Sequence, residues 1–120
     1  MGSYILQDTK SGHKTLLYNN GREIRIHSKY DPVMEAERSA EAFDPGRADT
    51  IVVCGLGLGY HASALVARFP DSIIIVIEKE SEVIELARAV NPSLLETIYT
   101  IQSPGDLDNI FEGLDLTGFT

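Results

Sequence analysis

The sequence has 120 residues, of which 43% are hydrophobic and 23% charged, a composition typical of one folded domain and not of a disordered chain. Its net charge of −8 argues against nucleic-acid binding, which requires a basic face. A single cysteine excludes a disulfide framework, and no apolar run is long enough to span a bilayer or resembles a signal peptide. We therefore expect a soluble cytoplasmic protein without a membrane or nucleic-acid partner.

Residues 1–30 are predicted to form a β-hairpin unit. The turn signal Asn20-Gly21 separates residues 14–18 from residues 23–27, and both stretches are rich in residues that favour strands. Residues 4–7 are a further candidate strand. The second hairpin strand alternates apolar and polar residues, a pattern that indicates one wet face: Ile24 and Ile26 against Arg25 and His27.

A helix is predicted to begin directly after this unit. Asp31 is a favourable N-cap residue, and Pro32 suits the first helical turn, where its missing N–H would have no partner. The helix is expected to stop at the turn signal Asp44-Pro45-Gly46. Apolar residues recur at helical spacing between these limits and predict the packed face: Val33, Ala36, Ala40 and Phe43.

From Thr50 onwards the pattern changes to alternating strands and helices. The first strand contains Cys54, which we expect to be a small core residue. Residues 73–77 are five consecutive aliphatic residues, typical of a strand that is covered on both faces. The predicted strands are 51–54, 73–77 and 98–101. The first predicted helix spans 59–69, and the second is capped by Ser81 and ended by Asn91-Pro92. A third helix is predicted after Ser103, with the apolar residues Leu107, Ile110, Phe111 and Leu114.

This order of elements predicts the fold class. Alternating β and α elements argue for an α/β fold with a Rossmann-like parallel sheet in a three-layer αβα arrangement, preceded by the N-terminal β-hairpin. We expect one domain over residues 1–120, made of the hairpin unit 1–30 and the helix plus β/α units 31–120. Only three parallel strands are recognisable, whereas complete sheets of this class have about five or six. We therefore expect either a partial or excised domain or a sheet that the N-terminal β unit completes.

The turn after the first parallel strand is the candidate binding site. It contains Gly55, Gly57 and Gly59 and leads into a helix N-terminus, which suits an anionic or polar ligand. The dinucleotide fingerprint requires its third glycine at position 60, where this chain has Tyr60. The spacing instead matches the first motif of S-adenosylmethionine-dependent methyltransferases, but Val53 stands where those enzymes commonly carry an acidic residue.

Two further side chains are expected at this turn. Glu78 ends the second parallel strand, and the carboxyl ends of neighbouring parallel strands meet at one edge of the sheet. Glu78 is therefore placed to accept hydrogen bonds from ribose hydroxyls, and His61 is a candidate donor to a ligand phosphate or carboxylate. The alternative is that the glycines serve packing alone, that Glu78 is solvated and that His61 is a surface or capping residue. No catalytic motif and no metal-ligand spacing is present, so no catalytic residue and no metal site is predicted.

Two segments have specific sequence patterns that composition alone does not explain. They are residues 27–36, His-Ser-Lys-Tyr-Asp-Pro-Val-Met-Glu-Ala, and residues 55–61, Gly-Leu-Gly-Leu-Gly-Tyr-His. Together they resemble the N-terminal region of the motility accessory factor family, over most of residues 12–90. Members are bacterial flagellin glycosyltransferases that transfer nonulosonic (sialic-acid-like) sugars from CMP-activated donors, and a related archaeal branch makes pterin diphosphates. Their transferase centre lies in a larger domain downstream.

The resemblance implies an accessory, non-catalytic N-terminal Rossmann-like domain. In such a domain Gly55, Gly57, Gly59, His61 and Glu78 are expected either to hold a nucleotide or a CMP-linked sugar or to dock the catalytic domain. The implied partners are the downstream catalytic domain and flagellin. One alternative is a methyltransferase-type domain that binds S-adenosylmethionine. Another is a pure interaction module, because residues 1–30 contain five basic and two acidic residues whereas residues 89–120 contain five acidic and no basic ones.

Overall fold

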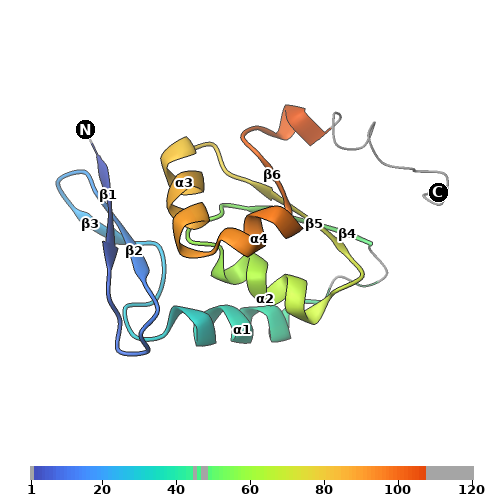
Figure 1. The fold of residues 1–120 in the computed structure, drawn as a ribbon, viewed down its shortest axis with the longest axis horizontal. Coiled ribbons are helices and arrows are strands. Elements are labelled where there is room, and N and C mark those ends of the chain that lie inside the picture. Colours follow the sequence, from blue (N-terminus) through green and yellow to red (C-terminus); the bar gives the residue numbers. More distant parts are fainter. Residues whose placement is uncertain (1, 45, 47–48, 108–120) are drawn as a thin grey trace.

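The structure is a computed structural model that describes residues 2–44, 46 and 49–107 (Figure 1). It contains two three-stranded sheets and their connecting helices, which confirms the predicted α/β class and the N-terminal hairpin. The antiparallel sheet consists of β1 (Ser3–Gln7), β2 (Thr15–Asn19) and β3 (Glu23–Arg25), and the parallel sheet of β4 (Thr50–Cys54), β5 (Ile73–Ile77) and β6 (Tyr99–Ile101). The helices are α1 (Pro32–Ala42), α2 (Tyr60–Arg68), α3 (Ser81–Val90), α4 (Pro92–Thr97) and the 3-10 helix η1 (Pro104–Asp106).

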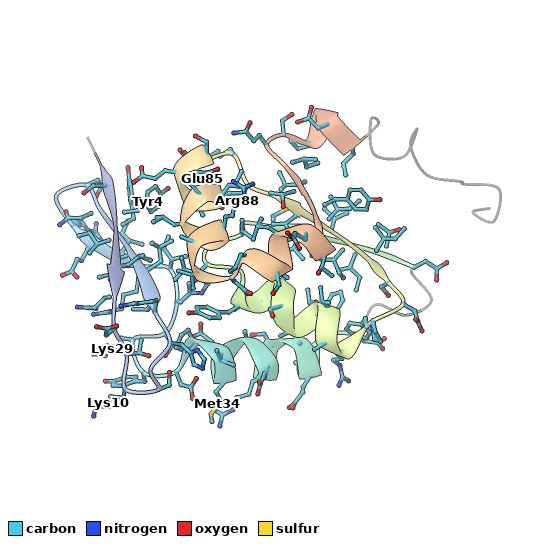
Figure 2. The ribbon with its side chains drawn as sticks, in the orientation of Figure 1. Tyr4, Lys10, Lys29, Met34, Glu85 and Arg88 are labelled. Carbon is cyan, nitrogen blue, oxygen red and sulfur yellow. The ribbon has the colours of Figure 1, made fainter. Side chains whose placement is uncertain are left out.

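The antiparallel sheet has the strand order β1-β2-β3. Its register pairs Tyr4 with Tyr18 and Tyr18 with Ile24, so these three side chains share one face. Figure 2 shows Tyr4 on the side of β1 that faces α3. Leu16, two residues before Tyr18 and therefore on the same face, is fully buried in the main core. The inner face of this sheet is thus turned toward the rest of the molecule.

The wet face predicted for the second hairpin strand is confirmed at Arg25, which is exposed, and is wrong at His27, which is only 6% exposed. Ile24 and Ile26, predicted on the dry face, are 46% and 41% exposed. Two tertiary contacts explain the burial of His27: the Thr15 hydroxyl donates to the His27 carbonyl at 3.0 Å, and the Leu58 N–H donates to His27 Nε2 at 2.8 Å. These polar contacts hold the imidazole against the parallel sheet and outweigh the local alternation.

The first helix begins as predicted, and its predicted packed face is wrong only at Phe43, which is 41% exposed. Asp31 caps α1, because its carboxylate accepts a hydrogen bond from the Met34 N–H at 3.0 Å. Ala36 and Ala40 are buried in the main core, and α1 packs along α2. None of the helices in the described part of the chain has the length and apolar composition needed to cross a membrane.

The parallel sheet has the strand order β4-β5-β6, and the three central residues of β5 are buried, as predicted for a strand covered on both sides. Ile51, Ile74 and Val76 lie on the face that shares one core with buried residues of all four α-helices. On the opposite face the central Ile75 is fully buried, whereas its neighbours Val52 and Tyr99 are 45% and 42% exposed. Among the described residues the α-helices share a core with one face only, and a third layer of helices is not seen there. The predicted last helix lies, from residue 108 onwards, outside the described residues.

Cys54 is exposed, and its predicted place in the core is therefore wrong. β4 forms one edge of the described parallel sheet, and Cys54 lies on the same face as the exposed Val52. Two boundaries also differ from prediction. Ser81 is the first residue of α3 and not its cap, and α4 follows α3 where no helix was predicted.

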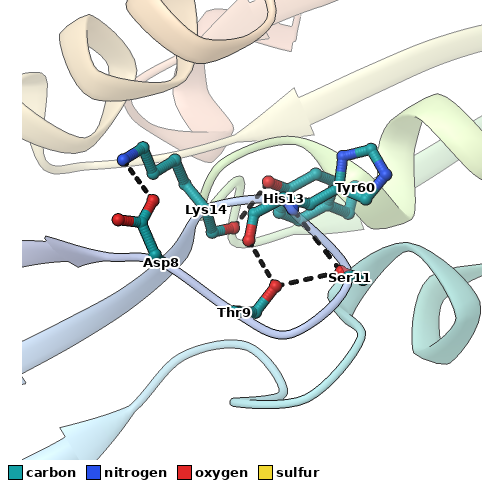
Figure 3. Close-up of polar contacts among 6 residues, drawn as sticks. All are labelled: Asp8, Thr9, Ser11, His13, Lys14 and Tyr60. Carbon is teal, nitrogen blue, oxygen red and sulfur yellow. Dashed lines mark hydrogen bonds and ion pairs between the residues drawn. The ribbon is translucent and has the colours of Figure 1, made fainter.

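Tyr60, the first residue of α2, joins the N-terminal sheet to the parallel sheet. Its hydroxyl donates to the Lys14 carbonyl at 2.5 Å (Figure 3). Its ring meets the His27 ring edge-on, with centroids 5.1 Å apart. Burial raises the pKa of Tyr60, so the hydroxyl stays protonated and remains a donor. The N-terminal sheet is thereby held beside the glycine turn that precedes α2.

Candidate functional site: a cleft over the glycine turn

A cleft of about 570 Å³ lies between the inner face of the antiparallel sheet and the carboxyl end of the parallel sheet. Open α/β sheets bind their ligands at this end of the strands, and the volume is that of a small-molecule site. The antiparallel side contributes Tyr4, Tyr18, Ile26 and His27, and the parallel side contributes Cys54, Gly55, Leu56, Gly57, His61, Glu78, Lys79, Glu80 and Val83.

The three glycines of the turn adopt positive φ angles of 93°, 54° and 91°, for Gly55, Gly57 and Gly59 respectively. A Cβ atom at Gly57 would stand 2.4 Å from His27 Nε2, and one at Gly59 would stand 2.5 Å from Leu94 Cδ2. A Cβ atom at Gly55 would meet nothing within 4 Å. Two of the glycines therefore serve close packing as well as the backbone conformation.

The N–H groups of the turn are largely committed within the protein. Gly55 donates to the Ile77 carbonyl at 2.8 Å, and Gly59 donates to the Leu56 carbonyl at 2.9 Å. The Leu56 N–H donates to Glu78 Oε1 at 3.0 Å, and the Leu58 N–H donates to His27 Nε2. A phosphate cradle is built from free backbone N–H groups. Four of the five backbone N–H groups from Gly55 to Gly59 already donate within the protein, so few are free to bind an anion.

Glu78 lies beside the glycine turn, and the structure thus places these two predicted features together. One oxygen of its carboxylate accepts from the Leu56 N–H, and the other accepts from the Glu80 N–H at 3.1 Å. These bonds fix the orientation of the carboxylate. Each carboxylate oxygen has two lone pairs, so Glu78 retains acceptor capacity toward a ligand hydroxyl or amino group.

His27 is the most deeply buried ionisable side chain of the cleft. Because Nε2 accepts a backbone N–H, the imidazole is neutral and carries its proton on Nδ1. Burial, followed by the charge of His61, lowers the pKa of His27 from 6.5 to about 4. Within the described part of the chain, the buried Nδ1 atom has no hydrogen-bond partner. Among the residues that the structure describes, His27 thus leaves a buried and inaccessible N–H donor without a partner beside the cleft.

His61 stands on the first turn of α2, where its ring lies edge-on to His27 with centroids 6.1 Å apart. It is half-buried, and among the described residues its Nδ1 atom also lacks a partner. Neither ring nitrogen pairs with an acidic side chain in the described hydrogen bonds. Among the described residues, both histidines therefore leave a buried Nδ1 atom without a hydrogen-bond partner beside the cleft.

Two tyrosines form an aromatic wall opposite the glycine turn. Tyr4 and Tyr18 are half-buried neighbours on the inner face of the antiparallel sheet, with ring centroids 4.9 Å apart. Burial raises the pKa of Tyr4, and the nearby carboxylates of Glu80 and Glu78 raise it further. The Tyr4 hydroxyl therefore faces an acidic neighbourhood, and the two rings offer an apolar surface.

The structure gathers most of the predicted site residues at one place. Gly55, Gly57, His61 and Glu78 line the cleft, whereas Gly59 lies outside the lining and is approached by Leu94 of α4. Sequence reasoning did not assign His27, Tyr4 or Tyr18 to the site. His27 opens the segment 27–36 that carries the family resemblance, and this was the one available signal. No sequence signal pointed to Tyr4 and Tyr18, because no local pattern predicts how the hairpin sheet packs against the rest of the protein.

The described residues contain no group of three or more histidine, cysteine, aspartate or glutamate side chains that could hold a metal ion. The cleft has an aromatic wall of Tyr4 and Tyr18, an acidic rim of Glu78 and Glu80, and the buried imidazole of His27. No protein-family model matches the sequence, and no curated protein is significantly similar to it.

Proposed function

We propose that this chain is the accessory, ligand-binding N-terminal domain of a protein glycosyltransferase similar to those of the motility accessory factor family, which modify flagellin. The contact between the two segments that carry the resemblance supports this proposal most. His27 opens residues 27–36, and it accepts the N–H of Leu58 in residues 55–61. Two segments that are 31 residues apart at this contact thus form the two sides of one cleft.

The proposed role of the domain is to hold a ligand and not to transform it. Glu78 and His27 are the groups best suited to proton transfer, but both already accept backbone N–H groups. Glu78 accepts those of Leu56 and Glu80, and His27 accepts that of Leu58. Such fixed groups position a ligand well. We propose a nucleotide, a nucleotide-sugar or a related nucleoside as the ligand, the downstream catalytic domain as the partner, and flagellin as the acceptor of the whole enzyme.

Disruption of the gene in its flagellated host is expected to leave flagellin without its nonulosonic sugars. The measurement is the intact mass of purified flagellin, which should fall by the mass of the attached sugars and recover when the complete gene is restored. An unchanged flagellin mass in the disrupted strain would contradict the transferase context. That result would not bear on ligand binding by the cleft, which thermal denaturation tests separately.

Ligand binding is expected to raise the thermal stability of the protein. A ligand at about 100 times its dissociation constant adds about 2.7 kcal/mol to the free energy of unfolding. Thermal denaturation with CMP, a CMP-linked sugar, S-adenosylmethionine, adenosine and NAD measures this effect. A Glu78→Gln variant should lose much of the shift, and Glu96→Gln, an equal change of charge at an exposed position outside the cleft, should keep it. Unshifted melting with every compound would contradict a nucleoside-type ligand.

A second candidate function is the cofactor domain of a methyltransferase. The observation that favours it is the hydrogen bond from Leu56 of the glycine turn to Glu78 at the end of the neighbouring strand. It supports this candidate because an acidic residue at the end of the second strand accepts hydrogen bonds from ribose hydroxyls in nucleotide-binding sheets. A stability gain with S-adenosylmethionine and none with the cytidine compounds would favour this candidate.

A further inference from the structure

We infer that the cleft over the glycine turn binds a neutral or positively charged nucleoside-class ligand and discriminates against the corresponding phosphorylated nucleotide. The inference rests on the proposed ligand-binding function, and it specifies the chemistry of that same site. Three separate features of the cleft support it: the charges at its rim, its free hydrogen-bonding capacity and its aromatic wall.

The charged groups at the rim disfavour a phosphate. Glu78 and Glu80 line the cleft, and Lys79 is the one lysine or arginine among its described lining residues. The turn cannot compensate, because most of its N–H groups are bound to Ile77, Glu78, His27 and Leu56. A phosphate that entered would meet two carboxylates with few free donors, and like charges at short range repel.

The free acceptor capacity of Glu78 suits a ligand that carries hydroxyl or amino groups. Both carboxylate oxygens of Glu78 are held by backbone N–H groups, and their remaining lone pairs can accept from a donor such as a ribose hydroxyl. A nucleoside offers such donors together with a base that can lie on the aromatic wall.

The aromatic wall completes the fit. Tyr4 and Tyr18 present adjacent rings on the side opposite the glycine turn, with Ile26 beside them. Nucleobases stack on aromatic side chains, and this stacking is tolerant of which base is present. The same rings attract a cation, which the carboxylates also favour. S-adenosylmethionine, with its sulfonium charge, therefore suits the cleft better than CMP does.

Matched pairs of ligands test the inference. Isothermal titration of the protein with adenosine and AMP, and with cytidine and CMP, compares each nucleoside with its own phosphate. We expect each nucleotide to bind at least about tenfold more weakly than its nucleoside. The ratio should shrink when salt is raised from about 0.05 M to about 0.5 M, because screening weakens the repulsion.

Two variants separate charge from shape. Glu80→Gln removes one rim charge at an exposed position and should bring the affinities of nucleoside and nucleotide closer, whereas Glu96→Gln, outside the cleft, should leave the ratio unchanged. Tyr4→Leu should weaken the binding of every nucleoside about tenfold or more. Tyr99→Leu, in the parallel sheet and outside the cleft, should leave the binding of every nucleoside unchanged.

The outcomes distinguish this inference from the function on which it rests. A nucleotide that binds as tightly as its nucleoside, or more tightly, overturns the inference and leaves the ligand-binding function standing. A tenfold preference that Glu80→Gln does not reduce overturns the electrostatic explanation of the selectivity. Failure of all four compounds to bind overturns both the inference and the nucleoside-type function proposed for the cleft.

Discussion

Gly57→Ala is expected to lower the free energy of unfolding by about 3 kcal/mol, the sum of backbone strain and of a displaced buried side chain. Gly57 has a φ of +54°, where a Cβ atom is unfavourable. The added atom would also stand 2.4 Å from His27 Nε2 and 2.8 Å from His27 Cε1. His27 cannot retreat cheaply, because it is buried and bonded to the Leu58 N–H.

Gly55→Ala is the matched control for this substitution. Gly55 has a φ of +93°, but a Cβ atom there meets nothing within 4 Å. The control therefore carries backbone strain alone, of about 1–2 kcal/mol. Urea denaturation of the wild type and both variants measures the difference. Equal losses at the two positions would show that His27 accommodates the methyl group, and the close packing of the imidazole on the turn would then be rejected.

Acidification from pH 6.5 to pH 4 is expected to cost about 3 kcal/mol of stability through His27 alone. The pKa of His27 falls from 6.5 to about 4 on folding, chiefly because burial penalises the charged ring. Between these pH values the unfolded chain binds the proton and the folded protein does not, so acid favours unfolding. The contribution is fully present above pH 6.5, declines through this window and is exhausted below pH 4.

Protonation would also break a specific bond. Nε2 accepts the Leu58 N–H, and a protonated nitrogen has no lone pair with which to accept. The glycine turn would then lose one of its supports at the same time as a charge enters the core. The loss of stability should therefore be accompanied by a weaker ligand affinity of the cleft, because the turn and His27 are two of its walls.

His27→Gln tests the pH dependence. The glutamine amide oxygen can accept a backbone N–H but does not titrate, so the variant should be less stable near pH 7 and lose stability less steeply between pH 6.5 and pH 4. Carboxylates titrate at the low end of this window in both proteins, and the difference between the two curves removes their common part. His13→Gln, at an exposed histidine, serves as the control and should retain the wild-type slope. Parallel curves for wild type and His27→Gln would contradict the assignment.

Local patterns were sufficient for most of the elements. The Asn20-Gly21 turn signal, the Asp31-Pro32 start of α1 and the aliphatic run of β5 each depend on neighbours in sequence, and each was predicted correctly. The nearness of Glu78 to the glycine turn also followed, since parallel strands place their carboxyl ends together. These features are determined by backbone geometry, which the sequence encodes over short distances.

Tertiary structure alone decided what surrounds the turn. Cys54 is exposed because β4 is an edge strand of the described sheet, and strand order is not a local property. His27 is buried because its imidazole accepts the N–H of Leu58, although strand alternation placed it in water. The commitment of the turn's N–H groups, and the aromatic wall across from them, arise from the docking of the two sheets. The sequence alone therefore located the turn, and the packing of the hairpin sheet against it determined the chemistry of the cleft.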